Sequence, residues 1–516
     1  MNKVEALDMP PASAHTRIHE LFDERVAQAP DHPFIVLTDG IVTLGELAQQ
    51  VNVLEAELRE DGVRPGDRVL VVAENCPEHV ALVLACSRVG AWACGVNARM
   101  TASEIAAFAA KSDAKLLYFT VGVSASARSH AQAHTPRASA LPTLLRSPLN
   151  LQATLPEPDL AQAVAAIIFT SGTTGQPKCV MLTHSGLLHF GKVSAQSRQL
   201  GPQDRSYAYL PMTHIFGLGT VLMASLYAGA SLLMRSQFDP AEVFEALAHQ
   251  GLTQLQGPPA MFTRLLTWLD SQGINKLAAP DLRYVYTGAA PLDLSVKKAV
   301  EARFDRPLHH GYGLSEYAGA LAVSQLGQWR DDTSAGYLVE GAELRIVSQQ
   351  GQDVQQGETG EIWMRGLGLM PGYFRDPEIT AQVIKPGGWY ASGDLGRQDA
   401  DGALYVVGRL KEMIIRSGFN VYPGEVEAVL LRWPGVHKAA VAGHKTADGN
   451  EDILAFIEAK AGVALDLVAL QAHADAHLAP YKRPSAWVVV PEMPMTLSGK
   501  VLKRELVERW LTQTVS

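Results

Sequence analysis

The sequence predicts an α/β fold that is extended by a smaller β-rich unit and by a separate α+β unit at its C-terminal end. Up to Glu316, short apolar runs alternate with stretches of helical apolar spacing, which is typical of a largely parallel sheet covered by helices. From Ala342 the apolar runs alternate with Gly and Asp turns, which indicates the β-rich unit. A second alternation of strands and helices begins after Leu410 and predicts the C-terminal unit.

The N-terminal elements follow from the spacing of apolar residues. Helical spacing predicts helices at 19–27, 44–58 and 77–89, and short apolar runs predict strands at 34–37, 69–72, 116–119 and 164–169. Residues 124–140 are rich in Ala, Ser and His without a period, so we expect an exposed loop there. Further along, strands are predicted at 207–210, 252–255, 283–286 and 308–311, with helices at 239–250 and 258–269.

One uncharged stretch, Ile215 to Met234, is long enough to resemble a membrane span. Gly217, Gly219 and the turn at 228–231 interrupt it, so we expect a buried helix followed by a strand and no membrane span. Acidic residues near the N-terminus leave no apolar run for a signal peptide, and the four cysteines show no metal or disulfide spacing. We therefore expect a cytoplasmic protein.

The chain length and charge narrow the function classes. A chain of 516 residues is long enough for about three folding units. Its net charge of −9 disfavours nucleic acid as a partner, because phosphate binding needs a basic face. The sequence leaves a homodimer open, since two-fold dimers are the commonest soluble oligomers.

The β-rich and C-terminal units define a domain boundary. Strands are predicted at 344–347 and 360–364, and the C-terminal elements at 425–431, 439–442, 453–458 and 486–490. No Pro/Gly-rich linker separates the two parts. We therefore predict an N-terminal domain of residues 1–409 and a C-terminal domain of residues 410–516, joined by a short hinge.

The segment IFTSGTTGQPKCVMLT, residues 168–183, has the composition of a phosphate-binding loop. Glycines allow backbone N–H groups to approach an anion closely, hydroxyl groups add donors, and a lysine adds charge. A Walker-type loop is excluded because the Gly-Lys-Ser/Thr sequence is missing. The candidate residues are Thr170, Ser171, Gly172, Thr173, Thr174, Gly175 and Lys178.

Five further positions carry groups that suit a nucleotide, although each has a simpler interpretation. His214 could be a packing residue, and the Tyr312–Glu316 segment could start a capped helix. Asp394 could serve a turn, and Lys500 could lie on a solvated face. Together with Arg409, these groups would suit adenine, ribose, phosphates and Mg²⁺, with a lysine supplied by a separate domain.

These motifs, taken in order, resemble the acyl- and aryl-CoA synthetase branch of the adenylate-forming superfamily, which also holds luciferases and the adenylation domains of peptide synthetases. The resemblance covers essentially the whole chain, and the segment GFNVYPGEVE (residues 418–427) adds to it. The chain departs from the family pattern at Cys179, where glycine is usual, and at Ser315 and Ser392, where threonine is commoner. No departure removes a functional group.

The resemblance implies a large N-terminal domain of stacked α/β subdomains with a β-rich subdomain, and a small mobile C-terminal domain. It implies a two-step reaction of a carboxylic acid with ATP and then with coenzyme A, assisted by Mg²⁺ on Glu316. Lys500, Glu316 and His214 are the catalytic candidates, with His214 between acyl pocket and thiol channel and not assigned as a base. The ATP- and CoA-binding candidates are the loop residues above and Gly288, Ala289, Ala290, Gly311, Tyr312, Gly313, Ser315, Asp394, Arg409, Lys411 and Gly418.

The wall of the acyl pocket is expected at 214–217, 257–262, 288–290 and 311–314, which are apolar or small and carry no fixed cation. This favours an aromatic or medium-chain aliphatic monocarboxylic acid as substrate. One alternative is transfer of the acyl group to a separate carrier protein. A second alternative is a non-catalytic nucleotide or acyl-ligand sensor. Acid-dependent ATP–pyrophosphate exchange would separate the enzyme from the sensor, and consumption of free CoA would separate the ligase from carrier loading.

Overall fold

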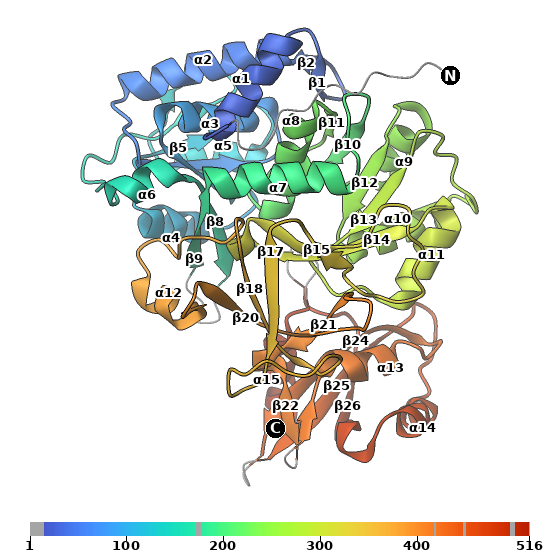
Figure 1. Cartoon of the computed structure of the whole chain (residues 1–516). Helices are drawn as coiled ribbons and strands as arrows, with labels where there is room; N and C mark the ends of the chain where they lie inside the picture. Colours follow the sequence, from blue (N-terminus) through green and yellow to red (C-terminus); the bar gives the residue numbers. More distant parts are fainter. Residues whose placement is uncertain (1–14, 172–176, 417–418, 447–449, 496–500, 515–516) are drawn as a thin grey trace.

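Two large sheets form the N-terminal body in the computed structural model, which describes residues 15–171, 177–416, 419–446, 450–495 and 501–514 (Figure 1). The seven-stranded sheet has the order β6-β7-β5-β3-β4-β8-β9, and its four central strands run parallel. Its strands are β3 (Arg68–Ala73), β4 (Trp92–Asn97), β5 (Leu116–Phe119), β6 (Arg137–Ala138), β7 (Leu145–Arg146), β8 (Val164–Ser171) and β9 (Pro177–Thr183). Every residue of β3 is buried, as expected for a central strand covered on both faces.

The nine-stranded sheet has the order β16-β15-β14-β13-β12-β10-β11-β1-β2 and is parallel from β14 to β1. Its strands are β1 (Pro33–Val36), β2 (Ile41–Thr43), β10 (Arg205–Ala208), β11 (Ser231–Met234), β12 (Gln254–Gly257), β13 (Tyr284–Thr287), β14 (Leu308–Leu314), β15 (Gly319–Val323) and β16 (Tyr337–Leu338). The predicted largely parallel α/β architecture is therefore confirmed, and antiparallel strands occur only toward the edges of both sheets.

The helices of this body connect and cover the strands. They are α1 (Ile18–Gln28), α2 (Leu44–Glu60), α3 (Pro77–Val89), α4 (Ala102–Ser112), α5 (Ala125–Gln132), α6 (Pro158–Ala163), α7 (His184–Ser197), α8 (Ala224–Ala228), α9 (Pro240–His249), α10 (Pro259–Ser271) and α11 (Leu294–Phe304). Local sequence explains several starts: Thr43 and Glu46 form a capping box before α2, and Thr101 and Glu104 form one before α4.

The uncharged stretch at 215–234 forms a buried helix and then strand β11, as predicted. Its first part, η2 (Phe216–Met223), is a π-helix, which the apolar spacing did not indicate. A Cβ atom at Gly217 would lie 2.3 Å from the carbonyl oxygen of Pro211, so this wide turn needs a glycine. Among the described residues, no helix combines the length and the apolar character that crossing a membrane requires.

The β-rich unit is a five-stranded sheet with α12 (Pro377–Val383) beside it. Its strands are β17 (Ala342–Val347), β18 (Gly360–Gly366), β19 (Ile384–Lys385), β20 (Trp389–Gln398) and β21 (Leu404–Arg409). The pairs are antiparallel, which confirms the change of texture predicted from Ala342 onward.

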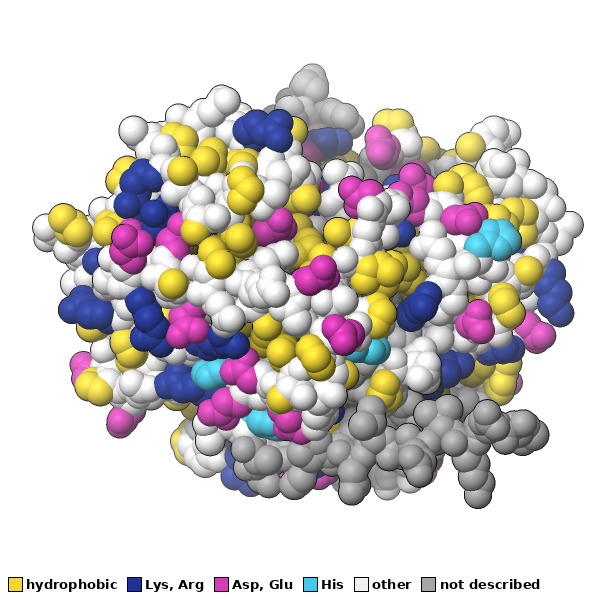
Figure 2. All heavy atoms as spheres, turned by 90° about the horizontal axis from the view of Figure 1, so that it is seen from above, with side chains coloured by type: hydrophobic (Ala, Val, Ile, Leu, Met, Phe, Trp, Pro, Cys, Tyr) yellow, Lys and Arg dark blue, Asp and Glu magenta, His cyan; other side chains and the backbone are white. Residues whose placement is uncertain are grey.

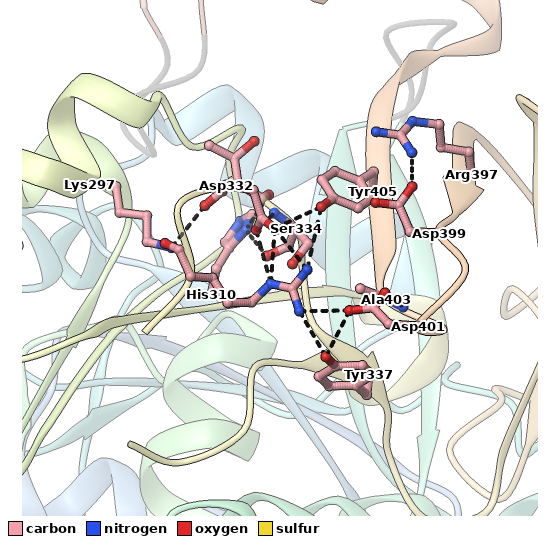
Figure 3. Close-up of polar contacts among 12 residues, drawn as sticks. Lys297, His310, Asp332, Ser334, Tyr337, Arg397, Asp399, Asp401, Ala403 and Tyr405 are labelled. Atoms are coloured by element: carbon pink, nitrogen blue, oxygen red, sulfur yellow. Dashed lines mark hydrogen bonds and ion pairs between the residues drawn. The ribbon is translucent and has the colours of Figure 1, made fainter. Parts of the chain in front are cut away.

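A charged network attaches this sheet to the segment between β15 and β16 (Figure 3). Arg330 pairs with Asp332 at 2.8 Å and with Asp401 at 3.0 Å, and Tyr405 of β21 donates to Asp332 at 2.8 Å. Although burial opposes it, the hydrogen bond from Arg330 and further donors lower the pKa of Asp332 below its usual value. The network fixes β21, the strand that leads to Arg409, against the N-terminal body.

The C-terminal unit is a small α+β structure, in orange to red at the bottom of Figure 1. It contains β22 (Ile414–Arg416), β23 (Phe419–Val421), α13 (Pro423–Leu430), β24 (Val436–Lys445), β25 (Glu451–Ala459), α14 (Leu467–His477), β26 (Ala486–Val490) and α15 (Lys503–Thr514). The strands β24, β25 and β26 form one sheet, and a separate apolar core packs beneath it. This agrees with the α+β prediction.

The sequence interpretation was wrong at 124–140. Residues 125–132 form α5, and the hydroxyl group of Ser124 accepts the backbone N–H of Ala127 at the helix start. A helix without apolar period was missed because a local cap and alanine content stabilise it.

On the face drawn in Figure 2, acidic and basic side chains are interspersed, so that face offers no continuous basic stripe to nucleic acid.

Candidate functional site

The predicted phosphate loop lies between two antiparallel strands of the seven-stranded sheet. Thr170 of β8 lies opposite Lys178 of β9, so the loop is closed by a regular ladder. The Nζ atom of Lys178 lies 4.8 Å from the centre of the Tyr373 ring, which is cation–π range. The loop residues Gly172, Thr173, Thr174 and Gly175 lie outside the described residues, as does the side chain of Ser171.

Tyr373 also holds the predicted metal ligand. Its hydroxyl group donates to Oε1 of Glu316 at 2.8 Å and lies 3.3 Å from the hydroxyl oxygen of Tyr390. Burial, followed by the charge of Glu316, raises the pKa of Tyr373, so the phenol stays protonated and remains a donor. The backbone of Phe374 donates to Cys179 O at 2.9 Å, which fastens this segment to β9. The carboxylate and the loop lysine are thus positioned by one tyrosine.

Three candidates from distant parts of the chain meet at Asp394. The hydroxyl group of Tyr312 donates to Asp394 Oδ2 at 2.7 Å, and Nε of Arg409 lies 3.2 Å from Asp394 Oδ1. Asp394 and Arg409 face each other across the β20–β21 ladder, so the sheet itself determines this pair. The hydroxyl oxygen of Ser392 accepts a hydrogen bond from the backbone N–H of Asp394 at 3.0 Å. Serine therefore provides the hydroxyl group that the commoner threonine would provide in this turn.

Positive charge gathers beside this carboxylate. Lys411 lies in the short 3-10 helix η4 (Leu410–Glu412), directly after β21. Desolvation, then the charge of Arg409, and further along the charge of Lys178, lower the pKa of Lys411. Three cations from the phosphate loop, the β-rich sheet and the hinge segment therefore share one region, and such a cluster suits a polyanion.

The backbone of the residues predicted to lie beside adenine closely approaches other segments of the chain. A Cβ atom at Gly313 would lie 2.2 Å from the carbonyl oxygen of Gly319, and one at Gly311 would lie 2.4 Å from the hydroxyl oxygen of Tyr286. Ala289, between Gly288 and Ala290, has a φ of 65°, an uncommon left-handed conformation for alanine. Both stretches lie at the carboxyl ends of the parallel strands β13 and β14, where ligands bind in open α/β sheets. Ser315 and Glu316 follow in a 3-10 turn, 315–317.

His214 lies between β10 and the π-helix. Its Nδ1 accepts the backbone N–H of Phe216 at 3.2 Å, which leaves Nε2 as the protonated nitrogen of the neutral ring. Asn75, in the connection between β3 and α3, donates to Leu210 O at 2.9 Å and accepts the N–H of Met212 at 3.0 Å. The segment between β10 and His214 is therefore held by the connection that follows β3.

Two further catalytic or binding candidates cannot be placed. Lys500 and Gly418 lie outside the described residues, so their roles remain predictions. Among the described residues, no group of three or more His, Cys, Asp or Glu side chains forms a metal centre. A single carboxylate such as that of Glu316 is compatible with Mg²⁺, because this ion usually takes one or two carboxylates and completes its shell with water and phosphate oxygens.

Sequence reasoning missed three residues at this site. Tyr373 and Asn75 stand in no motif and are recognised only by their partners in space. Arg198 follows α7, and the sequence analysis assigned it no role, yet its side chain is buried near Tyr286. No local signal distinguishes a buried arginine from an exposed one.

Comparison with known proteins identifies the family to which the chain is similar. The model of the AMP-binding enzyme family matches residues 22–374, and that of the AMP-binding enzyme C-terminal domain matches residues 425–500. A sulfoacetate–CoA ligase from Cupriavidus necator is 31% identical over 500 residues, covering 94% of this chain and 96% of the relative. A feruloyl-CoA synthase from Amycolatopsis is 34% identical over 498 residues, with 94% and 98% covered.

The fold has a solved counterpart in the crystal structure of ATP-bound MatB from Rhodopseudomonas palustris. The two structures agree with a TM-score of 0.84 at 27% identity, covering 95% of this chain and 99% of that one. The family model spans most of the chain, and relatives above 30% identity align over nearly all of it. The chain therefore belongs to the AMP-binding enzyme family, as its motifs predicted.

Proposed function

We propose that this protein is an ATP-dependent carboxylic acid–CoA ligase that acts through an acyl-adenylate and releases AMP and pyrophosphate. The observation that carries the proposal is the meeting of Asp394 with Arg409 and with Tyr312, which lies 82 positions earlier in the chain; these three residues would form a ribose and adenine site. Membership of the AMP-binding enzyme family and the CoA-ligase names of its relatives support the same chemistry.

In the first step a carboxylate oxygen attacks the α-phosphorus of ATP, and the bond to the β-phosphate breaks to release pyrophosphate. Two anions must approach each other, so positive groups aimed at the shared charge lower the barrier. Lys178 and the loop would hold the β- and γ-phosphates, and Lys500 would bridge the carboxylate and the α-phosphate. Glu316, oriented by Tyr373, is the residue that would hold Mg²⁺, which supplies additional positive charge to the phosphates.

In the second step the CoA thiol attacks the acyl carbon, and the bond to AMP breaks. The chain would present a different face of its C-terminal domain, including Gly418, by turning about Lys411. The contacts around the hinge support a boundary between residues 1–409 and 410–516. Arg409 belongs to the β21 ladder, whereas Glu412 pairs with Lys503 of α15 at 3.3 Å.

The substrate is proposed to be an aromatic or medium-chain aliphatic monocarboxylic acid. The residues expected to form the pocket wall support this, because Phe216, Met261 and Phe262 are buried and apolar. The His214 ring would lie between this pocket and the thiol channel, where Nε2–H could donate a hydrogen bond to an acyl oxygen.

The experiment is a screen of carboxylic acids by two assays on one preparation. Acid-dependent exchange of radiolabelled pyrophosphate into ATP reports adenylation, and CoA-dependent release of AMP reports thioester formation. The proposal predicts both signals with the same acid. Exchange without CoA-dependent AMP release would contradict CoA as the acceptor and favour a carrier protein. Binding of nucleotide without exchange for any acid would contradict an enzyme altogether.

A further inference from the structure

A small cavity of about 20 Å³ lies behind the expected acyl pocket, between α7, the π-helix and the sheet. Its wall combines apolar and polar side chains and includes Phe190, Val193, Arg198, Thr220, Tyr284 and Tyr286. A cavity of this size has room for about one water-sized group. A mostly apolar wall with a few polar groups at one end is typical of a small-molecule site.

Tyr286 links this cavity to the expected acyl pocket. Its hydroxyl oxygen lies so close to Gly311 and Gly288 that added Cβ atoms would be 2.4 and 3.0 Å away. Its ring packs edge-to-face against Phe216, with centroids 5.8 Å apart. Both glycine segments and Phe216 belong to the predicted pocket wall, so the tyrosine lies at the inner end of that pocket.

Arg198 provides an unusual charge at the same place. Its side chain is buried, with 2% of the residue exposed, and its guanidinium group bonds to uncharged acceptors. Nη1 donates to Oε1 of Gln254 at 3.2 Å and of Gln256 at 3.3 Å, and Nη2 donates to Oγ of Ser194 at 2.7 Å and to Thr220 O at 2.6 Å. No carboxylate among the described residues lies within ion-pair distance of this guanidinium group.

Tyr284 and Tyr286 line the cavity, and their hydroxyl groups have no hydrogen-bond partner among the described residues. The Nε2 groups of Gln254 and Gln256 are buried without a hydrogen-bond partner in the described structure. Burial raises the pKa of Tyr286 to about 12 and that of Tyr284 as well, so both phenols keep their protons. Buried donors without acceptors are costly, and a ligand oxygen in the cavity would accept hydrogen bonds from the two phenols, since the N–H groups of Arg198 already donate to protein acceptors.

We propose that Tyr286, Tyr284 and Arg198 form the distal end of the acyl pocket and select acids with an apolar body and one hydrogen-bond-accepting oxygen at the far end. The oxygen belongs to a ketone, an ether or a phenol, because the cavity takes about one such group and is too small for a second carboxylate. This inference rests on the proposed function and names the substrate class within it.

The first test uses the unaltered protein and matched acids. Octanoic acid is compared with the oxo-octanoic acid whose ketone lies beside the terminal carbon, and phenylpropanoic acid with its para-methoxy derivative. The oxygen-bearing acid of each pair should have a kcat/KM for CoA-dependent AMP release that is about 3- to 10-fold higher. Equal or higher values for the plain acids overturn the proposal. A preference for octanedioic acid over both aliphatic monoacids also overturns it, because the site would then bind an anion.

The second test is Tyr286→Phe, which removes the hydroxyl group and keeps the ring. It should lower kcat/KM for the oxygen-bearing acids about 3- to 10-fold and leave the plain acids within twofold, which abolishes the preference. The matched control is Tyr207→Phe in β10. Ser206 lies opposite Gln254, which lies opposite Tyr284, so the side chain of Tyr207 points to the other face of the sheet. This control should keep the preference. An unchanged preference in Tyr286→Phe contradicts the proposal.

The two levels of inference fail in different ways. If no acid supports pyrophosphate exchange, the proposed function is wrong. If several acids support exchange and CoA-dependent AMP release without regard to a distal oxygen, the ligase assignment stands and the distal site is wrong.

Discussion

The hydroxyl group of Tyr373 donates a hydrogen bond to Glu316 across 2.8 Å, while the ring of the same residue lies under the ammonium group of Lys178. One side chain therefore positions both the predicted metal-binding carboxylate and the lysine of the predicted phosphate loop. Tyr373 itself is 3% exposed, so this arrangement is held by packing. We therefore expect Tyr373 to act as a positioning residue for the predicted nucleotide site.

Tyr373→Phe is expected to raise the Mg²⁺ concentration needed for half-maximal pyrophosphate exchange. The ring remains beneath Lys178, but Glu316 loses a donor that fixes its orientation, and loss of such a supporting group typically costs about 10-fold or more in metal affinity. The measurement is a Mg²⁺ titration at saturating ATP and acid.

The control for this titration is Tyr390→Phe, because the Tyr390 hydroxyl group lies 3.3 Å from that of Tyr373 and forms no hydrogen bond with Glu316 in the described structure. It should shift the titration less than Tyr373→Phe. Glu316→Gln should shift it more than either. If Glu316→Gln shifts the curve and Tyr373→Phe does not, the positioning role is refuted while the metal-binding role survives.

Asp394→Asn is expected to raise the KM for ATP by about 10-fold or more, with a smaller effect on the KM for the acid. The change removes the negative charge that attracts Arg409 and weakens the hydrogen bond that this side chain accepts from Tyr312. The side chain at position 394 would then lose the orientation it needs to bind ribose. Initial rates of pyrophosphate exchange over a range of ATP concentrations measure it. Asp305→Asn, at an exposed turn far along the chain, is the matched control and should leave both constants unchanged.

Lys500→Ala is expected to slow acyl-adenylate formation by about 100-fold or more, because a charge aimed at the transition state is lost. Thioester formation from supplied acyl-adenylate should be affected far less. Single-turnover assays of the two half-reactions measure the difference. Lys460→Ala, an exposed lysine of the same domain, serves as control, and equal damage to both half-reactions by Lys500→Ala would contradict the assignment.

Stability is expected to fall on acidification because His79 is buried without a charge. Burial lowers the pKa of this ring to about 4, so below pH 6.5 the unfolded chain binds a proton that the folded chain does not. The contribution of His79 is complete above pH 6.5 and is lost as the pH falls toward 4, at about 1.4 kcal/mol per pH unit.

His79→Gln should therefore reduce the loss of unfolding free energy between pH 7 and pH 5 by about 1 to 2 kcal/mol. Urea unfolding followed by fluorescence at several pH values measures this slope. The absolute stability of the variant can differ from that of the parent without affecting the test. Parallel pH profiles for the two proteins would refute the role of His79.

Local patterns were enough for most of the architecture. The strand at 116–119 was predicted with its observed bounds, and the helix at 77–89 likewise, because each is a short apolar run or a proline-started helix whose type depends on its own residues. The strands at 207–210 and 252–255 were predicted two residues away from β10 and β12, since strand ends depend on pairing with neighbours. The π-helix at Phe216–Met223 could not be predicted, because its wide turn is imposed by the packing of Gly217 against Pro211.

By itself the sequence determined the α/β class and the order of the units, and it predicted the phosphate loop and the acidic and basic residues of a nucleotide site. These follow from composition, period and motif, which are properties of neighbouring residues. Only the tertiary structure decided that Asp394 meets Tyr312 and Arg409, that Tyr373 orients Glu316, and that Arg198 is buried behind Tyr286. These contacts join residues far apart in the chain, and their geometry arises from strand register and burial, which no local stretch of sequence encodes.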